Sequence, residues 1–206
     1  MVQNTITAAF SENYPMILIF TAVIVSLRLV YLVVHKEKFV FYKEFGSLVF
    51  LLYSLILFYV VTFQDVNYGT NNFIPFHEIM RYEFGSSFFI HNIIGNIILF
   101  IPFGYFVSYI LKTKRPFALL VVSFITSIVI EYTQLKIGRT FDVDDIILNL
   151  VGSICGYLVY LVIRLIGDKL PPFFQSQLFK NIFVVVIIIV LVFIYSRSTL
   201  WGILRW

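Results

Sequence analysis

The chain has 206 residues, of which 60% are hydrophobic and only 13% are charged, and its formal net charge is +4. A soluble domain is about half apolar and about a quarter charged, so this composition excludes an ordinary soluble protein and indicates an integral membrane protein. The basic residues are scattered through short segments and form no stripe, which excludes nucleic acid as the partner that the charge serves.

Six apolar segments are long enough, or nearly so, to cross a membrane. They predict an all-α fold, a polytopic integral membrane bundle of about six transmembrane helices, in a single transmembrane domain of residues 1–206. No internal repeat and no low-complexity linker divides the chain. In chain order, the predicted spans are residues 15–34, 46–63, 88–111, 116–132, 146–166 and 178–195.

The connection between the second and third predicted spans, residues 64–91, is long and partly apolar. Residues 72–76 are too apolar for a solvated loop, and His77, Glu78 and Arg81 follow directly. This pattern predicts a short interfacial helix or a re-entrant turn that begins near Pro75.

The distribution of basic residues predicts the orientation of the bundle. The connections at one membrane face carry nine Lys or Arg residues, and the segments at the other face carry five. Cytoplasmic connections hold an excess of Lys and Arg, so residues 36–43 and 112–115 are predicted to be cytoplasmic. Both termini and residues 64–91 are then predicted to lie outside the plasma membrane.

Polar residues of the third, fourth and fifth spans gather at the outer end of each span. Residues three or four apart share one face of a helix, and these polar residues have such spacings. Because the three spans alternate in direction, the three polar sets meet at the same membrane face. The residues that we predict to form one site there are Asn92, Asn96, Glu131, Gln134, Arg139, Asp142, Asp145 and Asn149.

Glu131 is the most informative of these residues, because a carboxylate within a span is costly unless it is paired, neutralised or hydrated. The partner that we expect for it is Arg139, which follows across a short connection. The alternative to a functional site is a packing network, in which amides hold the helices together and Gly152 and Gly156 form a small-residue contact face.

A metal site is a further alternative, because carboxylate and imidazole groups are common metal ligands. The spacing does not favour one: the sequence has no His-Glu-x-x-His helix, and residues 141–145 lack the glycine and the distal glutamate of a calcium loop. We therefore expect no metal and no cofactor. The residues weighed as ligands are His77, His91, Glu131, Asp142, Asp144 and Asp145.

Residues 72–156 contain a series of strings in a fixed order. They are Asn-Phe-Ile-Pro-Phe at 72–76, Asn-x-x-Gly-Asn at 92–96, Leu-Phe-Ile-Pro-Phe-Gly at 99–104, Ile-Glu-x-x-Gln at 130–134, Gly-Arg-x-x-Asp-x-x-Asp at 138–145 and Asn-x-x-Gly-x-x-x-Gly at 149–156. Together these strings resemble the VanZ-like family. The resemblance implies a bacterial plasma-membrane protein linked to resistance against teicoplanin and related lipid-tailed glycopeptides, and it implies no defined reaction.

One hypothesis is a binding site at the outer leaflet for a polar head group. The ligand would be a membrane lipid, a lipid-linked cell-wall precursor or a lipoglycopeptide, and Arg139 and Arg81 would contact its phosphate or carboxylate. The side chains expected to orient it are Asn72, Asn92, Asn96, Gln134, Asp142 and Asn149.

A second hypothesis is an intramembrane enzyme that modifies such a lipid. Glu131 would be its general acid or base, with Asp145 ionised nearby and Arg139 holding the anion. The sequence therefore leaves open whether the protein is an enzyme, and it leaves the oligomeric state open as well. A transporter is disfavoured because no repeat is detectable, and a purely structural role is the remaining alternative.

Overall fold

The computed structural model describes residues 2–63, 71–112 and 115–203, and the described chain is helical with no strand longer than an isolated bridge. This confirms the predicted all-α fold. In chain order, the elements are α1 (Val2–Val34), α2 (Phe41–Phe63), α3 (His77–Arg81), α4 (Ser87–Phe89), η1 (Ile90–Ile94), α5 (Gly95–Leu111), α6 (Phe117–Lys136), α7 (Val143–Lys169), α8 (Pro172–Gln175) and α9 (Gln177–Ile203).

Four helical segments among the described residues are long and apolar enough to cross a membrane. They overlap the second to fifth predicted spans. The first and last predicted spans lie on α1 and α9, where the apolar stretches that the structure describes, Leu18–Val34 and Gln177–Phe193, are shorter. The four longer segments are Phe41–Val60, Ser87–Leu111, Phe117–Lys136 and Val143–Lys169.

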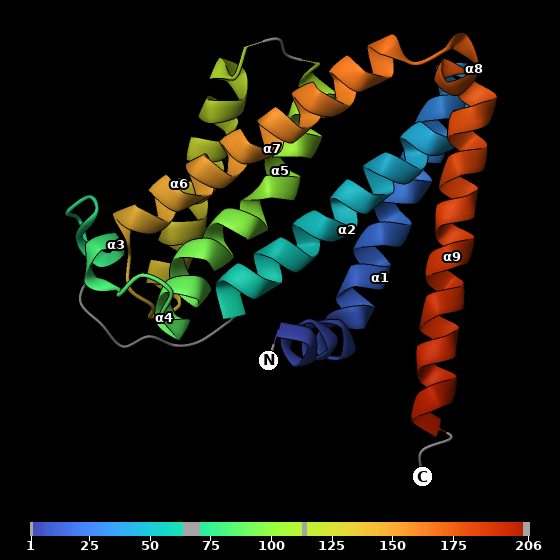
Figure 1. Ribbon diagram of the computed structural model, residues 1–206. Helices are drawn as coiled ribbons and strands as arrows, with labels where there is room; N and C mark the ends of the chain where they lie inside the picture. The colour runs from blue at the N-terminus through green and yellow to red at the C-terminus, as the bar shows by residue number, and fades with distance from the viewer. Residues whose placement is uncertain (1, 64–70, 113–114, 204–206) are drawn as a thin grey trace.

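The long helices alternate in direction, as Figure 1 shows. One end of the bundle holds the connections α1–α2, α5–α6 and α7–α9. The other end holds α3, α4, the α6–α7 connection, the start of α1 and the end of α9. The basic connections counted in the sequence therefore lie at one end of the bundle, and the predicted polar site lies at the other.

Helices α5 and α7 pack closely because three glycines line their contact. A Cβ atom at Gly104 would collide with the backbone of Ser153, and one at Gly152 would lie 2.9 Å from the Cβ of Phe100. A Cβ at Gly156 would likewise collide with the backbone of α5. The predicted small-residue contact face is confirmed, and it brings the backbones of α5 and α7 together as in other membrane bundles.

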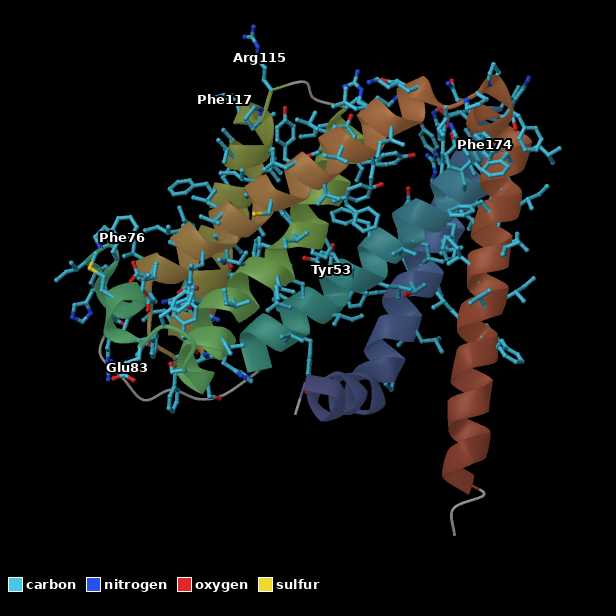
Figure 2. The ribbon with its side chains drawn as sticks, viewed as in Figure 1. Tyr53, Phe76, Glu83, Arg115, Phe117 and Phe174 are labelled. Atoms are coloured by element: carbon cyan, nitrogen blue, oxygen red, sulfur yellow. The ribbon has the colours of Figure 1, made fainter. Side chains whose placement is uncertain are left out.

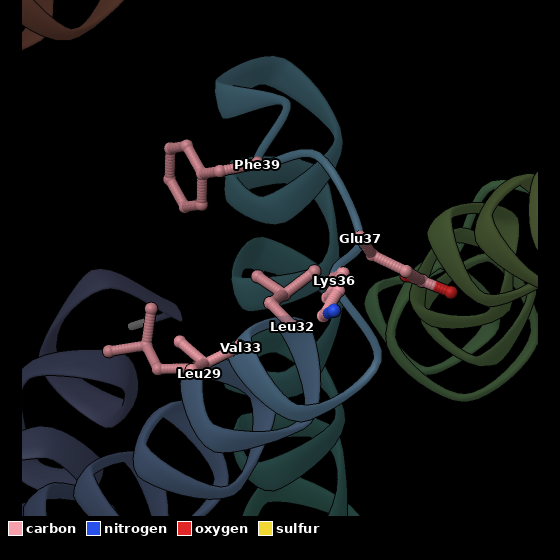
Figure 3. A pocket seen from close by; sticks show the side chains of 6 residues that line it. All are labelled: Leu29, Leu32, Val33, Lys36, Glu37 and Phe39. Carbon is pink, nitrogen blue, oxygen red and sulfur yellow. The ribbon is translucent and has the colours of Figure 1, made fainter.

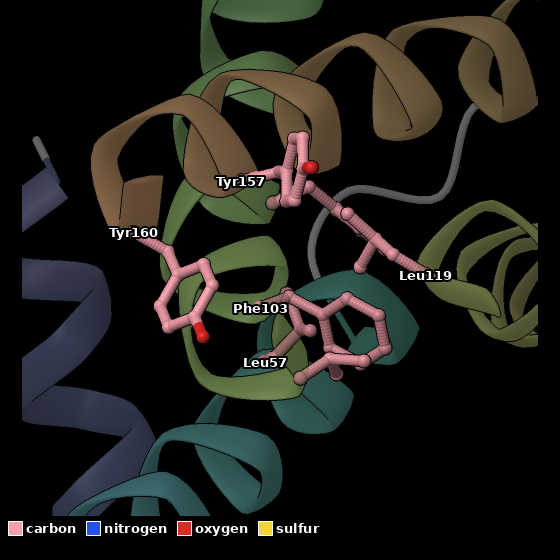
Figure 4. Packing of buried hydrophobic residues seen from close by; sticks show 7 residues of the cluster. Leu57, Phe103, Leu119, Tyr157 and Tyr160 are labelled. Atoms are coloured by element: carbon pink, nitrogen blue, oxygen red, sulfur yellow. The ribbon is translucent and has the colours of Figure 1, made fainter. Parts of the chain in front are cut away.

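The apolar core lies beside this contact, towards the basic end of the site helices. Leu57 of α2, Phe103 of α5, Leu119 of α6 and Tyr157 and Tyr160 of α7 pack into one cluster (Figure 4). Four helices from distant parts of the sequence are thus fixed relative to one another. The polar ends of α5, α6 and α7 extend from this rigid core.

Candidate functional site

The connection between α6 and α7 begins with a glycine turn that redirects the chain. Gly138 has a φ of 86°, in the left-handed region. The N–H of Gly138 donates to Leu135 O at 3.3 Å, and the N–H of Arg139 donates to Gln134 O at 2.9 Å. This is the Schellman pattern that ends many helices, and it returns Arg139 to the end of the bundle.

Asp142 begins α7 and links it to α6. Its Oδ1 accepts the N–H of Asp144 at 2.8 Å, as an N-cap does. The same oxygen accepts Asn72 Nδ2 at 2.8 Å. The backbone N–H of Asp142 donates to Glu131 Oε2 at 2.9 Å. Burial raises the pKa of the Asp142 carboxyl above its usual range. The two hydrogen bonds that this carboxyl accepts, from the Asp144 N–H and from Asn72 Nδ2, oppose the rise.

Glu131, Asp145 and Arg139 form the centre of the polar cluster. Glu131 is 1% exposed, and Asp145 Oδ1 accepts Asn96 Nδ2 at 2.6 Å. Arg139 lies close enough to both carboxyl groups to interact with each electrostatically. The cluster thus joins α5, α6, α7 and the α6–α7 connection, and Asp142 adds a third carboxyl group next to Glu131.

The segment after the second span is docked onto this cluster through Asn71 and Asn72. The N–H of Asn72 donates to Phe141 O at 2.8 Å, and the N–H of Val143 donates to Asn72 O at 3.0 Å. The Oδ1 of Asn71 accepts the N–H of Phe141 at 3.0 Å. Asn72 therefore holds its own segment against the start of α7 with its backbone and with its side chain.

Asp144 holds α3 against α7, although the sequence indicated it only as a possible metal ligand. Its side chain is 1% exposed and accepts three backbone N–H groups from the start of α3: Phe76 to Oδ1, Glu78 to Oδ2 at 2.8 Å and Ile79 to Oδ2 at 3.2 Å. The residue before α3, Phe76, provides no side-chain cap. Asp144 therefore caps α3 from the first turn of α7.

The other predicted site residues lie around this centre in different ways. Gln134 and Asn149 are buried. Asn92 lies in the π turn η1, and its amide donates to Phe88 O at 3.1 Å, within its own helical segment. Arg81 is paired with Glu78 at 3.2 Å on the exposed side of α3. The structure thus brings Asn96 to the carboxyl groups, whereas the contacts of Asn92 and Arg81 are local.

The face of α6 that continues inward from Glu131 is also polar. Ser127 and Ser123 lie one and two helical turns before Glu131 in the chain, and both are fully buried. Within the described part of the chain, neither hydroxyl has a hydrogen-bond partner. Small side chains allow α6 to approach its neighbours closely, which keeps Glu131 fixed within the bundle.

An open hollow lies at the opposite end of the bundle, between α1 and the start of α2 (Figure 3). Its volume is 330 Å³. Because its lining is mostly apolar and comes from other helices, it is separate from the carboxyl cluster. The lining residues are Leu29, Leu32, Val33, Lys36, Glu37 and Phe39.

Comparison with known proteins gives one match. A family model described as VanZ/LLP1 matches residues 48–164, which is more than half of the chain. This range runs from α2 to α7 and includes every residue of the carboxyl cluster. No curated protein and no solved structure matches the chain.

Proposed function

The chain belongs to the VanZ/LLP1 family, and we propose that it is a bacterial plasma-membrane protein whose carboxyl cluster binds the head group of an envelope lipid at the outer leaflet. Its role would be in resistance to teicoplanin and related lipid-tailed glycopeptides. In this proposal both termini and α3 lie outside, and the connections α1–α2 and α5–α6 are cytoplasmic.

The observation that carries the proposal is a group of buried carboxyl groups at the end of three packed helices. Glu131 Oε2 accepts the Asp142 N–H at 2.9 Å, and Asp145 Oδ1 accepts Asn96 Nδ2 at 2.6 Å. Arg139 lies in the α6–α7 connection at the same end. A charged group within a membrane span is retained at a cost, and such groups usually serve a function. Apolar residues would pack the helices together equally well, so the presence of several carboxyl groups and one arginine supports a binding role.

The composition of the cluster also indicates the chemistry of the ligand. Carboxylates accept hydrogen bonds, whereas a guanidinium only donates them. Glu131, Asp142 and Asp145 outnumber Arg139, so the best-matched head group carries one anionic group for the guanidinium and several hydroxyl or ammonium donors for the carboxyl groups. A lipid-linked sugar or an amino-bearing phospholipid has these features.

An enzyme acting on the same lipid is the second candidate, and one feature of Glu131 favours it. Glu131 is buried beside Asp142, and its Oε2 accepts the Asp142 N–H at 2.9 Å. A buried carboxyl group held in this position can exchange a proton with a bound substrate. General acid–base catalysis of this kind contributes about 10² to 10⁴ in rate.

The test is Glu131→Gln, which keeps the shape of the side chain and removes its charge and its proton-transfer capacity. The readout is growth in teicoplanin compared with growth in vancomycin, with the amount of membrane protein measured alongside. We expect the variant to accumulate normally and to lose protection against teicoplanin, with little change in vancomycin. The matched control is Glu83→Gln, which removes an exposed carboxylate at the same end of the bundle.

The degree of loss separates the candidates. A binding role predicts a partial loss that higher expression restores, because a charge-assisted contact contributes about 1.5–3 kcal/mol. A catalytic role predicts a loss that expression does not restore. Full protection by the Glu131→Gln protein, or equal effects on the two drugs, would contradict the proposal. Arg139→Lys is the companion variant, since lysine keeps the charge and lacks the two-pronged geometry of arginine.

A further inference from the structure

The outer end of the bundle exposes a row of large apolar side chains. Met80 of α3 is 82% exposed, and Phe84, in the turn after α3, is 91% exposed. Figure 2 shows Phe76 and Glu83 of this segment projecting at the end of the bundle beyond α7. We call residues 73–88 the outer elbow. Its exposed apolar side chains are Phe73, Ile74, Phe76, Met80, Phe84 and Phe88.

The outer elbow is held in a defined position by hydrogen bonds. Asp144 binds the N–H groups of Phe76, Glu78 and Ile79. Phe76 itself has a φ of 67°, an unusual value for a bulky residue, which is kept only where the surroundings fix it. The exposed side chains are therefore presented outwards by a fixed backbone.

The attachment to α7 sets the depth of the outer elbow in the membrane. Helix α7 has 27 residues and is therefore about 40 Å long, against a hydrocarbon core of about 30 Å. Its first turn then lies near the boundary between hydrocarbon and water. Because Asp144 belongs to that turn, α3 lies at the same boundary. The membrane-spanning segment Ser87–Leu111 begins three residues after Phe84.

The surroundings of this patch favour membrane lipid as its partner. The apolar side chains adjoin lipid-facing residues of the neighbouring span, such as Ile90, which is also exposed. His77, Glu78 and Arg81 share α3 with Met80, so the helix carries charged groups beside an apolar one, as interfacial helices do. Large exposed apolar patches mark interaction surfaces, and here the surface is continuous with the lipid-facing belt.

We propose that the outer elbow inserts into the outer leaflet, with Met80, Phe84 and Ile74 among the acyl chains. The carboxyl cluster next to it is then entered from the membrane side. This second step rests on the proposed function and names its ligand class: a membrane-resident amphiphile whose tails stay in the leaflet while its head group reaches Arg139.

The test uses tryptophan as a depth probe in the full-length chain. The two native tryptophans, Trp201 and Trp206, are replaced with phenylalanine, and single tryptophans are placed at Met80 and at Phe84. The proteins are reconstituted into vesicles of phosphatidylcholine and phosphatidylglycerol with brominated acyl chains, which quench tryptophan on contact. Ile125→Trp, on the exposed face in the middle of α6, is the control for a residue in the hydrocarbon core.

We expect shallowly brominated lipid to quench positions 80 and 84 to at least about half the extent seen at position 125, since an interfacial helix buries its apolar face about 5–10 Å deep. Quenching by acrylamide in the water and not by lipid would overturn the proposal. Quenching by neither reagent, together with cross-linking between two chains at position 80, would overturn it in favour of a second copy as the partner.

The quenching result is independent of resistance, so the two proposals fail separately. If lipid quenches positions 80 and 84 while Glu131→Gln keeps full protection, the membrane insertion stands and the proposed function fails. If Glu131→Gln loses protection while lipid leaves both positions unquenched, the binding site stands and its entrance faces the water.

Discussion

Replacing Asp144 with alanine removes the carboxyl group that holds the start of α3 on α7. Three backbone N–H groups, of Phe76, Glu78 and Ile79, lose their partner. Hydrogen bonds to a charged acceptor contribute about 1.5–3 kcal/mol each, so the three together contribute at most about 4.5–9 kcal/mol. Loss of an ordinary N-cap costs about 1 kcal/mol. Because water reaches the released groups, we expect the attachment of α3 to weaken by about 2–4 kcal/mol.

Hydrogen exchange of the α3 amides measures this change directly. Since about 1.4 kcal/mol corresponds to a factor of ten, the amides of Glu78 and Ile79 should exchange about 30- to 700-fold faster in the Asp144→Ala protein. The amides in the middle of α6 should be unchanged, which shows that the bundle remains folded. Glu83→Ala is the control at an exposed carboxylate of the same segment. Unchanged exchange at Glu78 and Ile79 would refute the assignment of Asp144 as the cap of α3.

Two further predictions concern the packing and the orientation of the bundle. Gly152→Ala should lower the free energy of unfolding, measured in detergent, by about 1–3 kcal/mol, because the added Cβ would collide with α5. Gly46→Ala is the control and should be neutral or stabilising, because no atom lies within 4 Å of a Cβ at that position. Equal stability of the Gly152→Ala and wild-type proteins would contradict the contact. In a Cys155→Ala background, a cysteine at His77 should react with a membrane-impermeant reagent from outside, and one at Lys112 should not; the reverse pattern would invert the orientation. Lys112 is used in place of Lys114 of the same connection, because Lys114 lies outside the described residues.

The sequence was sufficient to predict the helical bundle and the centre of the polar site. Helical spacing on α6 and α7, combined with alternating spans, predicted that Glu131 and Asp145 would lie at one end of the bundle. A short helix after Pro75 was one of the two alternatives predicted from the apolar start and the charged residues of this segment, and the structure has that helix at His77–Arg81. These features follow from the local periodicity of the sequence and from the length that a helix needs to cross a membrane, so a single sequence is enough to predict them.

Two features depended on tertiary detail that periodicity does not contain. Asn92 and Asn96 are four residues apart and were expected to share a face, but the π turn Ile90–Ile94 changes the helical register between them. Asp144 caps a helix that lies far from it in sequence, so its role was missed. A signal was present: no Ser, Thr, Asp or Asn immediately precedes α3, and an uncapped helix start needs an acceptor from elsewhere.

The most direct test of the central claim is the lipid that binds to the purified protein. Wild-type protein in detergent is mixed with a bacterial polar lipid extract, and bound lipid is measured by native mass spectrometry. Arg139→Gln should lower the affinity for the retained lipid by about 10- to 150-fold, because it removes a charge-assisted contact of about 1.5–3 kcal/mol. Lys169→Gln, which removes the same charge at the opposite end of α7, should retain it. Equal lipid occupancy in the wild-type and Arg139→Gln proteins would contradict the claim that this cluster binds an envelope lipid.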